Sequence, residues 1–129
     1  MLLTRVRLAG SPLHGLGVFA AEPIAEGTVV WRFTPGFDLD IDPAKLAEQP
    51  DAARDFLRHF GYVDVNLGRF VLCCDHARFI NHSDRPNLRS DRSRDAHGMD
   101  VANRNIAIGE ELTLDYRVLE GRRPYDPVR

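Results

Sequence analysis

Residues of the types that ligate metals lie close together in the middle of the chain. They are Cys73, Cys74, Asp75, His76 and His82. Thiolates and imidazoles bind zinc, but this spacing matches no common zinc pattern, and the sequence has no CxxC pair. Neighbouring cysteines on a strand also point to opposite faces, which separates them as ligands and as disulfide partners. We expect neither a metal nor a disulfide, and a metal protein is the weaker alternative.

A polar stretch from Asp75 to Asp95 shows no regular periodicity. Long polar loops inside compact domains are usually functional or disordered. This one contains Arg78-Phe79-Ile80-Asn81-His82-Ser83 close to Pro86-Asn87, a group of side chains rich in hydrogen-bond donors and acceptors. We therefore expect the stretch to be functional.

Short strands separated by turns make up most of the remaining sequence. This pattern predicts a mostly β fold in one domain over residues 1–129. Asn66-Leu67-Gly68-Arg69 is typical of a hairpin turn between two of the strands. The expected strands are Leu2–Leu8, Val18–Ala20, Thr28–Phe33, Tyr62–Val65, Phe70–Cys74, Met99–Asn103 and a short, mixed Leu112–Tyr116.

A small helical insertion is expected over about residues 42–61. Asp42 followed by Pro43 is a typical helix start, with an N-cap residue and then a proline at the first helical position. Pro50 interrupts this helix, and Asp51 can cap a second segment whose apolar residues share one face. Gly61 is well placed to end that segment.

Composition limits where the protein works and what it binds. An apolar content of 43% is enough to bury a core, and no apolar stretch is long enough to span a membrane. The N-terminal segment is too short and too charged for a signal peptide, so we expect a soluble, cytoplasmic protein. A net charge of −2 gives no general electrostatic case for nucleic acid or an anionic membrane.

Charge is nevertheless uneven along the chain. A solvated surface is the simpler interpretation of each charged run, and the sharper one is that the acidic run borders a groove for a basic peptide. The acidic run comprises Asp38, Asp40, Asp42, Glu48 and Asp51, and the basic C-terminal run comprises Arg117, Arg122, Arg123 and Arg129.

Three segments resemble the SET-domain family, in the family's own order. Residues 78–87 (RFINHSDRPN) are similar to its RFINHSCxPN, and residues 109–116 (GEELTLDY) are similar to its GEELTYDY. Residues 14–20 (HGLGVFA) are similar to its first motif, a glycine-aromatic-glycine turn followed by VFA. The likeness covers essentially the whole chain and is nearest to the short, single-domain bacterial members.

The resemblance implies several short sheets, with the segment of Asn81 threaded against that of Tyr116 in a knot-like arrangement. It implies transfer of a methyl group from S-adenosylmethionine to a protein lysine, with S-adenosylhomocysteine as product and no metal. Tyr116 is then the catalytic residue, because its hydroxyl can orient the amine and polarise the methyl group without adding a full charge. The implied cofactor-binding residues are His14, Gly15, Leu16, Arg78, Asn81 and His82.

The resemblance also implies a channel for the substrate lysine beside Tyr116, lined by Leu114, Thr34 and Tyr62. Leu114 stands where the family has Phe or Tyr, a position that tunes how many methyl groups fit, so we expect di- or trimethyllysine. Thr34 stands where many relatives carry a further channel tyrosine. Tyr62 either supplies the missing aromatic ring or is an ordinary core residue. Leu16 replaces the usual aromatic of the first motif.

Two departures affect how the site closes. Asp84 replaces the cysteine of the family's NHSCxPN, and no CxCxxxxC segment follows, so the zinc that many relatives share there cannot form. We expect no pre-SET or zinc-binding post-SET region, and residues 117–129 should close the channel, with Tyr125 or Arg123 near the adenine. The departures leave one main alternative, a non-catalytic SET-like module that binds a protein partner.

The expected partner is a protein substrate with an accessible lysine. Nucleic acid and membrane are not expected as partners. Some small members of the family dimerise to complete a site, so a homodimer is an open alternative for a chain this short.

Overall fold

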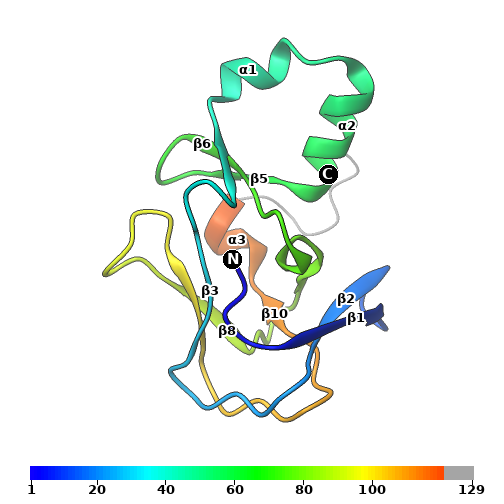
Figure 1. Ribbon diagram of the computed structural model, residues 1–129, viewed down its shortest axis with the longest axis vertical. Helices are drawn as coiled ribbons and strands as arrows, with labels where there is room; N and C mark the ends of the chain where they lie inside the picture. Colours follow the sequence, from blue (N-terminus) through cyan, green and yellow to red (C-terminus); the bar gives the residue numbers. More distant parts are fainter. Residues whose placement is uncertain (121–129) are drawn as a thin grey trace.

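Strands account for most of the regular structure in the computed structural model, which describes residues 1–120 (Figure 1). This confirms the expected mostly β class with a small helical insertion. The strands are β1 (Val6–Gly10), β2 (Leu16–Ala20), β3 (Val29–Arg32), β4 (Leu39–Ile41), β5 (Tyr62–Asp64), β6 (Arg69–Leu72), β7 (Asn81–His82), β8 (Leu88–Asp91), β9 (Met99–Ala102) and β10 (Thr113–Leu114). The helices are α1 (Pro43–Ala47), α2 (Asp51–Phe60), the 3-10 helix η1 (His76–Phe79) and α3 (Tyr116–Glu120).

Four small sheets organise the described residues. Antiparallel pairing joins β1 with β2, arranges three strands in the order β3-β9-β8, and arranges three more in the order β4-β6-β5. The two short strands β7 and β10 pair in parallel, with Asn81 opposite Thr113 and His82 opposite Leu114. This pairing brings together the two segments of the expected knot-like threading, and the threading itself stays a prediction.

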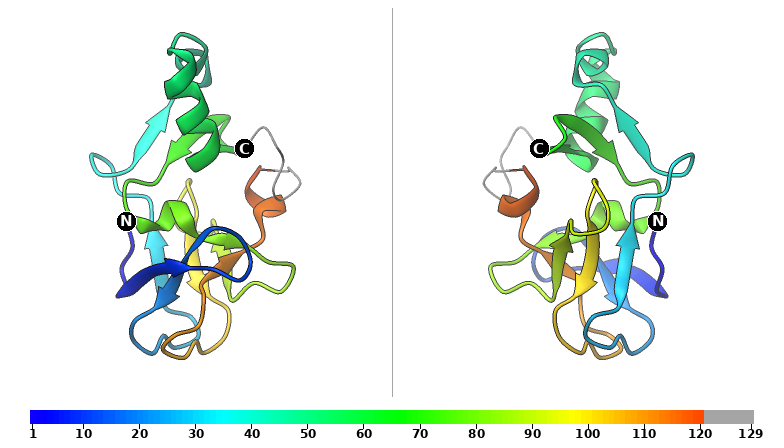
Figure 2. Two further views of the ribbon diagram at one scale, coloured as in Figure 1. Left: turned by 90° about the vertical axis from the view of Figure 1, so that its right-hand side faces the viewer. Right: turned by 90° about the vertical axis from the view of Figure 1, so that its left-hand side faces the viewer.

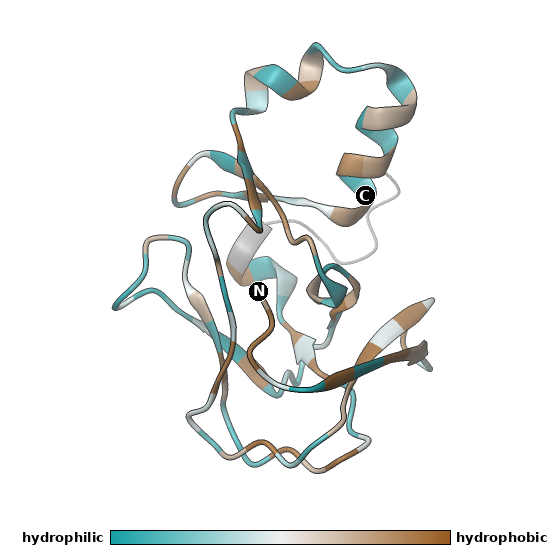
Figure 3. Cartoon of the chain, viewed as in Figure 1, coloured by the Kyte–Doolittle hydropathy of each residue, from teal (hydrophilic) through white to brown (hydrophobic). Residues whose placement is uncertain are grey.

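A single apolar core connects the four sheets. Strand residues alternate between faces, so most of the short strands contribute one or two side chains to this core. In Figure 3 the β1–β2 hairpin carries brown, hydrophobic segments, in keeping with the burial of its inner face. The most completely buried apolar side chains are Val18, Val30, Val71, Leu88, Ile106 and Leu112.

The helical insertion forms a separate arm at one end of the molecule, above the β4-β6-β5 sheet (Figures 1 and 2). As expected, Asp42 caps α1 by accepting a hydrogen bond from the Ala44 amide at 2.9 Å, and Pro43 begins the helix. Asp51 does not cap α2 as predicted: Pro50 holds the cap position without a side-chain bond, and Asp51 is the first helical residue.

Gly61 follows α2 directly, as predicted, because of close packing rather than a left-handed turn. A Cβ at this position would lie 2.1 Å from the Phe70 ring, well inside contact distance. It would also lie 2.9 Å from the Val71 carbonyl oxygen, so a larger residue at this position would push the chain away from β6.

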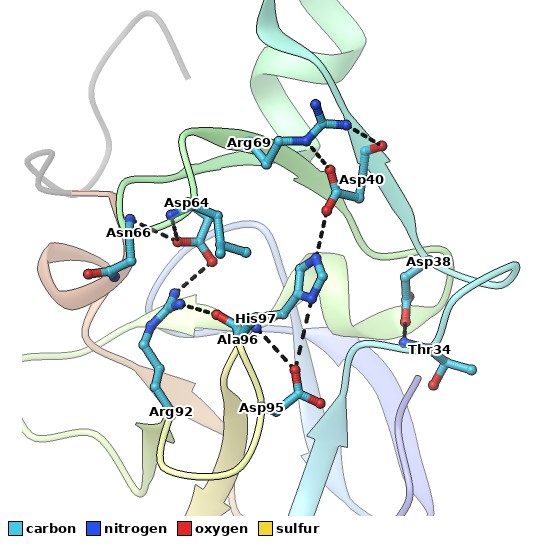
Figure 4. Close-up of polar contacts among 11 residues, drawn as sticks. Thr34, Asp38, Asp40, Asp64, Asn66, Arg69, Arg92, Asp95, Ala96 and His97 are labelled. Carbon is cyan, nitrogen blue, oxygen red and sulfur yellow. Dashed lines mark hydrogen bonds and ion pairs between the residues drawn. The ribbon is translucent and has the colours of Figure 1, made fainter.

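Polar contacts attach the β4-β6-β5 sheet beneath this arm to the β8–β9 hairpin (Figure 4). His97 Nε2 lies 2.7 Å from a carboxylate oxygen of Asp40, whose other oxygen accepts a hydrogen bond from Arg69. Arg92 donates to the fully buried Asp64 at 2.6 Å. Burial opposes ionisation of Asp40, but the hydrogen bonds from Arg69 and His97 outweigh it and lower its pKa.

Several local expectations need correction. The first strand begins at Val6 rather than Leu2, although Leu2 forms an isolated bridge with Trp31. Strand β8 lies inside the stretch expected to be irregular, and β4 lies inside the acidic run. The segment 112–116 contributes only the two residues of β10, and a helix begins at Tyr116.

The acidic run is not a uniform solvated surface. Asp38 is buried and accepts hydrogen bonds from the amides of Thr34 and Cys74, and Asp40 is bound by Arg69 and His97. Asp42 is used as a helix cap. Within residues 1–120, no helix is long and apolar enough to cross a lipid bilayer.

Candidate active site

Asn81 is the point where the three motif segments meet. It is buried in β7, and its side-chain amide donates to the carbonyl oxygens of His14 at 2.9 Å and Leu16 at 3.0 Å. The same nitrogen lies 3.1 Å from a carboxylate oxygen of Glu111. The amide therefore ties the turn at residues 14–16 to the parallel β7–β10 pair, although 65 or more residues separate them.

The turn at residues 14–16 is closed from its other side by Ser11. The Ser11 hydroxyl accepts the Leu13 amide at 2.9 Å, and the Ser11 amide donates to the Gly15 carbonyl at 2.8 Å. Gly15 has φ +45, the left-handed region in which glycine carries no Cβ strain. The side chains of His14 and Leu16 are exposed. Backbone groups of an ordered turn thus lie at the surface beside Asn81.

Gly17 fits between this turn and Glu111. A Cβ at Gly17 would lie 1.9 Å from a carboxylate oxygen of Glu111, the oxygen that Asn81 contacts. Asn87 braces the same region, because its side chain donates to the Glu111 carbonyl at 2.8 Å and accepts the Thr113 amide at 2.9 Å. Glu111 and Asn87 are site residues that we did not predict individually, although both lie inside the quoted motifs.

Replacing Gly17 with alanine should lower the free energy of unfolding by about 1–3 kcal/mol, because the added methyl group displaces the Glu111 carboxylate. Urea denaturation measures this. Gly10→Ala is the matched control in the same hairpin, because no atom lies within 4 Å of its Cβ position, and it should change stability by less than about 0.5 kcal/mol. When Glu111 is already replaced by alanine, Gly17→Ala should lower the free energy of unfolding by little more. An equal cost in both backgrounds would show that the Glu111 contact is not the cause.

His82 connects the β7 loop to the start of α3. Its Nδ1 accepts a hydrogen bond from the Tyr116 amide at 3.2 Å, so its Nε2 carries the proton that Asp84 accepts at 3.2 Å. Asp84 also lies 3.1 Å from the guanidinium of Arg117. The aspartate that stands in place of the family cysteine thus bridges His82 and α3 through polar contacts.

Tyr116 lies at the end of a narrow pocket. It is buried, and its hydroxyl donates to the carbonyl of Ile80, the residue before Asn81. The pocket holds about 40 Å³, room for roughly three water molecules. Its wall is mostly aromatic and aliphatic, and its lining residues are Trp31, Phe60, Tyr62, Cys73, Ala77, Arg78, Ile80, Asp100, Leu114 and Tyr116.

Arg78 forms one side of this pocket and also fastens the helical arm. Its Nε donates to the Cys73 carbonyl at 3.0 Å, and its guanidinium lies 5.6 Å from the Phe56 ring centre and 5.8 Å from that of Phe60. Both distances suit a cation–π contact. The structure thus gives Arg78 a place in the pocket wall together with a bracing role.

Asp100 is the one acidic residue among the lining residues of the pocket. Burial is the main influence and raises its pKa to about 7, while the N-terminal amino group and Arg92 act in the opposite direction. Burial likewise raises the pKa of Tyr62 and of the Cys73 thiol, so both are neutral near pH 7. We did not predict Asp100, because a lone aspartate in a short strand carries no sequence signal.

The predicted site residues thus fall into two neighbouring groups and one outlier. The first group consists of the turn and β7, with His14, Gly15, Leu16, Asn81 and His82. The second group lines the pocket and consists of Arg78, Leu114, Tyr62 and Tyr116. Thr34 lies in the turn after β3, where its amide donates to Asp38, and it is not among the lining residues of the pocket. Tyr125 and Arg123 lie outside the described residues.

The candidate metal ligands of the sequence do not form a cluster. Cys73 is buried in the pocket wall and Cys74 is exposed. Among the residues that the structure describes, no three His, Cys, Asp or Glu side chains lie close enough together to hold a metal ion.

A model of the SET domain matches residues 15–117. A histone-lysine N-methyltransferase of Candida albicans, H3 lysine-36 specific, is 28% identical over 121 residues, covering 89% of this chain and 14% of its own length. The histone-lysine N-methyltransferase ATX2 of Arabidopsis thaliana is 31% identical, covering 88% and 11%, and the enzyme trr of Drosophila melanogaster is 30% identical, covering 87% and 5%. The chain therefore spans only a small part of these curated relatives.

Solved structures share the fold. A histone methyltransferase candidate of Plasmodium falciparum superposes with a TM-score of 0.61 at 22% identity, covering 89% of this chain and 95% of its own. A chain of a humanized mutant of the Chaetomium thermophilum Polycomb Repressive Complex 2, bound to the inhibitor GSK126, superposes with a TM-score of 0.62 at 25% identity, covering 90% and 15%.

Proposed function

This chain belongs to the SET-domain family, and on that premise we propose that it transfers a methyl group from S-adenosylmethionine to the side-chain amine of a lysine in a protein. The observation that carries the proposal is the meeting of the three motif segments at Asn81, directly beside a narrow pocket that contains Tyr116. A cofactor at the turn and a lysine in the pocket would then approach each other from the two groups of residues.

The residues present suit this chemistry. Backbone groups of the ordered turn at residues 14–16 and the polar face of Asn81 and His82 would hold the cofactor, which supplies the methyl group on a positive sulfonium. Methyl transfer needs the amine, the methyl carbon and the sulfur in line and free of competing water. An unbranched alkylamine chain in the narrow, largely apolar pocket would displace its few waters and lie beside Tyr116.

Calorimetric titration with S-adenosylmethionine tests the cofactor half of the proposal. We expect saturable binding that Asn81→Ala removes and that Asn66→Ala, the same change at an exposed hairpin position, leaves intact. Transfer of a labelled methyl group to core histones or to a cell extract tests the second half. A folded protein that binds no S-adenosylmethionine would instead support the non-catalytic protein-binding module.

The number of methyl groups transferred should depend on Leu114. Its buried side chain lines the pocket next to Tyr116, and leucine offers less bulk than an aromatic ring and no hydroxyl. We expect mass spectrometry of the product to show di- or trimethyllysine with the natural protein and mostly monomethyllysine with Leu114→Tyr. Leu114→Phe separates the effect of bulk from that of the hydroxyl. Monomethyllysine alone from the natural protein would contradict the expectation.

The finer points of the proposal rest on the sequence resemblance. We propose a single-domain protein of the small bacterial type that works in the cytoplasm on a protein substrate, with histones as the first to test because the relatives are named for them. A homodimer that completes the site is part of the same proposal, and light scattering of the purified protein measures it directly.

A further inference from the structure

Asp100 occupies an unusual position for a carboxylate. It lies in the middle of β9, directly opposite Trp31 of β3 in the antiparallel register, and it lines the same pocket as Tyr116. Only 7% of the residue is exposed. Its neighbours in the pocket include Trp31, Tyr62, Arg78 and Leu114. The buried indole N–H of Trp31 has no hydrogen-bond partner among residues 1–120.

The other two buried aspartates are satisfied by the protein itself. Asp64 is bound by Arg92 at 2.6 Å and by the amides of Asn66 and Leu67, and Asp38 accepts the Thr34 and Cys74 amides (Figure 4). The Asp100 carboxylate accepts no hydrogen bond and forms no ion pair with any residue between 1 and 120. A buried carboxylate without a partner is costly, and its place in a pocket suggests that the partner is a ligand.

Charges around Asp100 can be named on each packed element. Arg92 and the Met1 amino group favour its ionised form, and the Arg78 guanidinium of η1 lines the same pocket. Tyr62 of β5 and Cys73 after β6 carry no charge near pH 7, since burial raises the pKa of each. Against these, burial of Asp100 has the largest influence and brings its pKa to about 7. The carboxylate is thus half ionised near neutral pH, where a proton acceptor works best.

Methyl transfer to lysine requires such an acceptor or an equivalent. A free lysine has a pKa of about 10.4, so only about one molecule in 2,500 carries the neutral, nucleophilic amine at pH 7. A pocket with room for about three waters holds few solvent molecules that could accept this proton.

Building on the proposed function, we infer that Asp100 accepts a proton from the substrate lysine ammonium inside this pocket. The N–H bond breaks, the carboxylate becomes a neutral acid, and the amine keeps its lone pair. That pair forms the new N–C bond while the C–S bond breaks toward sulfur, leaving a neutral thioether and a methylammonium. Asp100 then releases its proton to solvent and is ready for a second methylation.

The pH dependence of kcat/KM tests the inference, with Asp100→Asn and Asp100→Leu as variants. The natural enzyme should use ionised Asp100 and the ammonium form of lysine, so its profile should fall below about pH 7 and above about pH 10. Asp100→Asn should be slower by about 10²-fold or more at pH 7.5, and its rate should keep rising up to pH 10 as lysine loses its own proton. Asp100→Leu should behave similarly. Variant profiles parallel to the natural one at every pH would overturn the inference.

A second readout separates failure of this inference from failure of the proposed function. n-Butylamine carries the terminal carbons and amine of lysine and can be added without cofactor or turnover. We expect the ¹³C resonance of the Asp100 carboxyl to shift saturably with butylamine, and Asp100→Asn to bind it at least tenfold more weakly. If the natural protein transfers no methyl group, the proposed function fails. Butylamine binding still tests whether Asp100 contacts an alkylammonium group in the pocket. If the chemical shift of the Asp100 carboxyl does not change when butylamine is added, the inferred role of Asp100 is overturned.

Discussion

Replacing Tyr116 with phenylalanine should lower kcat by about 10²–10³-fold while S-adenosylmethionine still binds with nearly unchanged affinity. The phenol is a fixed dipole beside the pocket, and removal of one such donor from a site of charge rearrangement typically has an effect of this size. The turn at residues 14–16 and Asn81, which would hold the cofactor, do not depend on the Tyr116 hydroxyl. Steady-state methylation assays and calorimetry on the same preparation measure both quantities.

A structural contribution of the hydroxyl must be separated from this effect. The Tyr116 hydroxyl donates to the Ile80 carbonyl, and leaving that buried group unpaired should lower stability by about 1–3 kcal/mol. Such a loss lowers Tm without lowering the activity of the molecules that remain folded. Tyr62→Phe, in the same pocket, is the matched control and should reduce kcat far less. If Tyr116→Phe keeps full activity in folded protein, Tyr116 is not the catalytic residue.

The sequence was most informative where short motifs carry unusual residues. Asn81 and Tyr116 were singled out because residues 78–87 and 109–116 resemble two SET-domain motifs, and the structure brings those segments together. The helical insertion was predictable from its cap, since Asp42 and Pro43 form a local signal that needs no partner. A helix cap of this kind can be predicted because its hydrogen bond forms between residues that are close in the sequence.

Long-range consequences were not predictable from local pattern. Strand β8 has only four residues and depends on pairing with β9, which supplies partners that the local sequence does not reveal. Asp38 looked like part of an acidic surface, but the fold turns it inward to accept two backbone amides. Asp100 was missed for the same reason, because its importance comes from the residues that the pocket places around it.

The most unusual expectation for stability concerns Asp100→Asn, which should make the protein more stable at pH 8 than the natural chain and little different at pH 4. The Asp100 pKa is about 7 in the folded protein and about 3.9 in the unfolded chain. Between these pH values the folded state holds a proton that the unfolded state has lost. Stability of the natural chain must therefore fall as pH rises through this window.

The size of this effect follows from the same difference. A shift of roughly three pKa units corresponds to about 4 kcal/mol, accumulated between about pH 4 and pH 7 and level above that range. Asparagine has no proton to lose, so the stability of the Asp100→Asn variant does not fall with pH in this range. Carboxyls with lowered pKa values, such as Asp40 and Asp115, give a slope of opposite sign at lower pH. They are common to both proteins, so the difference between the two urea denaturation series isolates Asp100.

Asp91→Asn provides the internal control for this comparison. Hydrogen bonds from Ser93 and Arg89 lower the Asp91 pKa to about 2. The difference in free energy of unfolding between Asp91→Asn and the natural chain should therefore change only between about pH 2 and pH 4 and stay level above pH 4. A flat difference for Asp100→Asn as well would show that its carboxyl titrates normally and needs no special role. A difference that grows from pH 4 to pH 7, together with slower methyl transfer, would mean that the fold tolerates a destabilising carboxylate because the reaction uses it, which is the pattern expected of a functional group rather than a structural one.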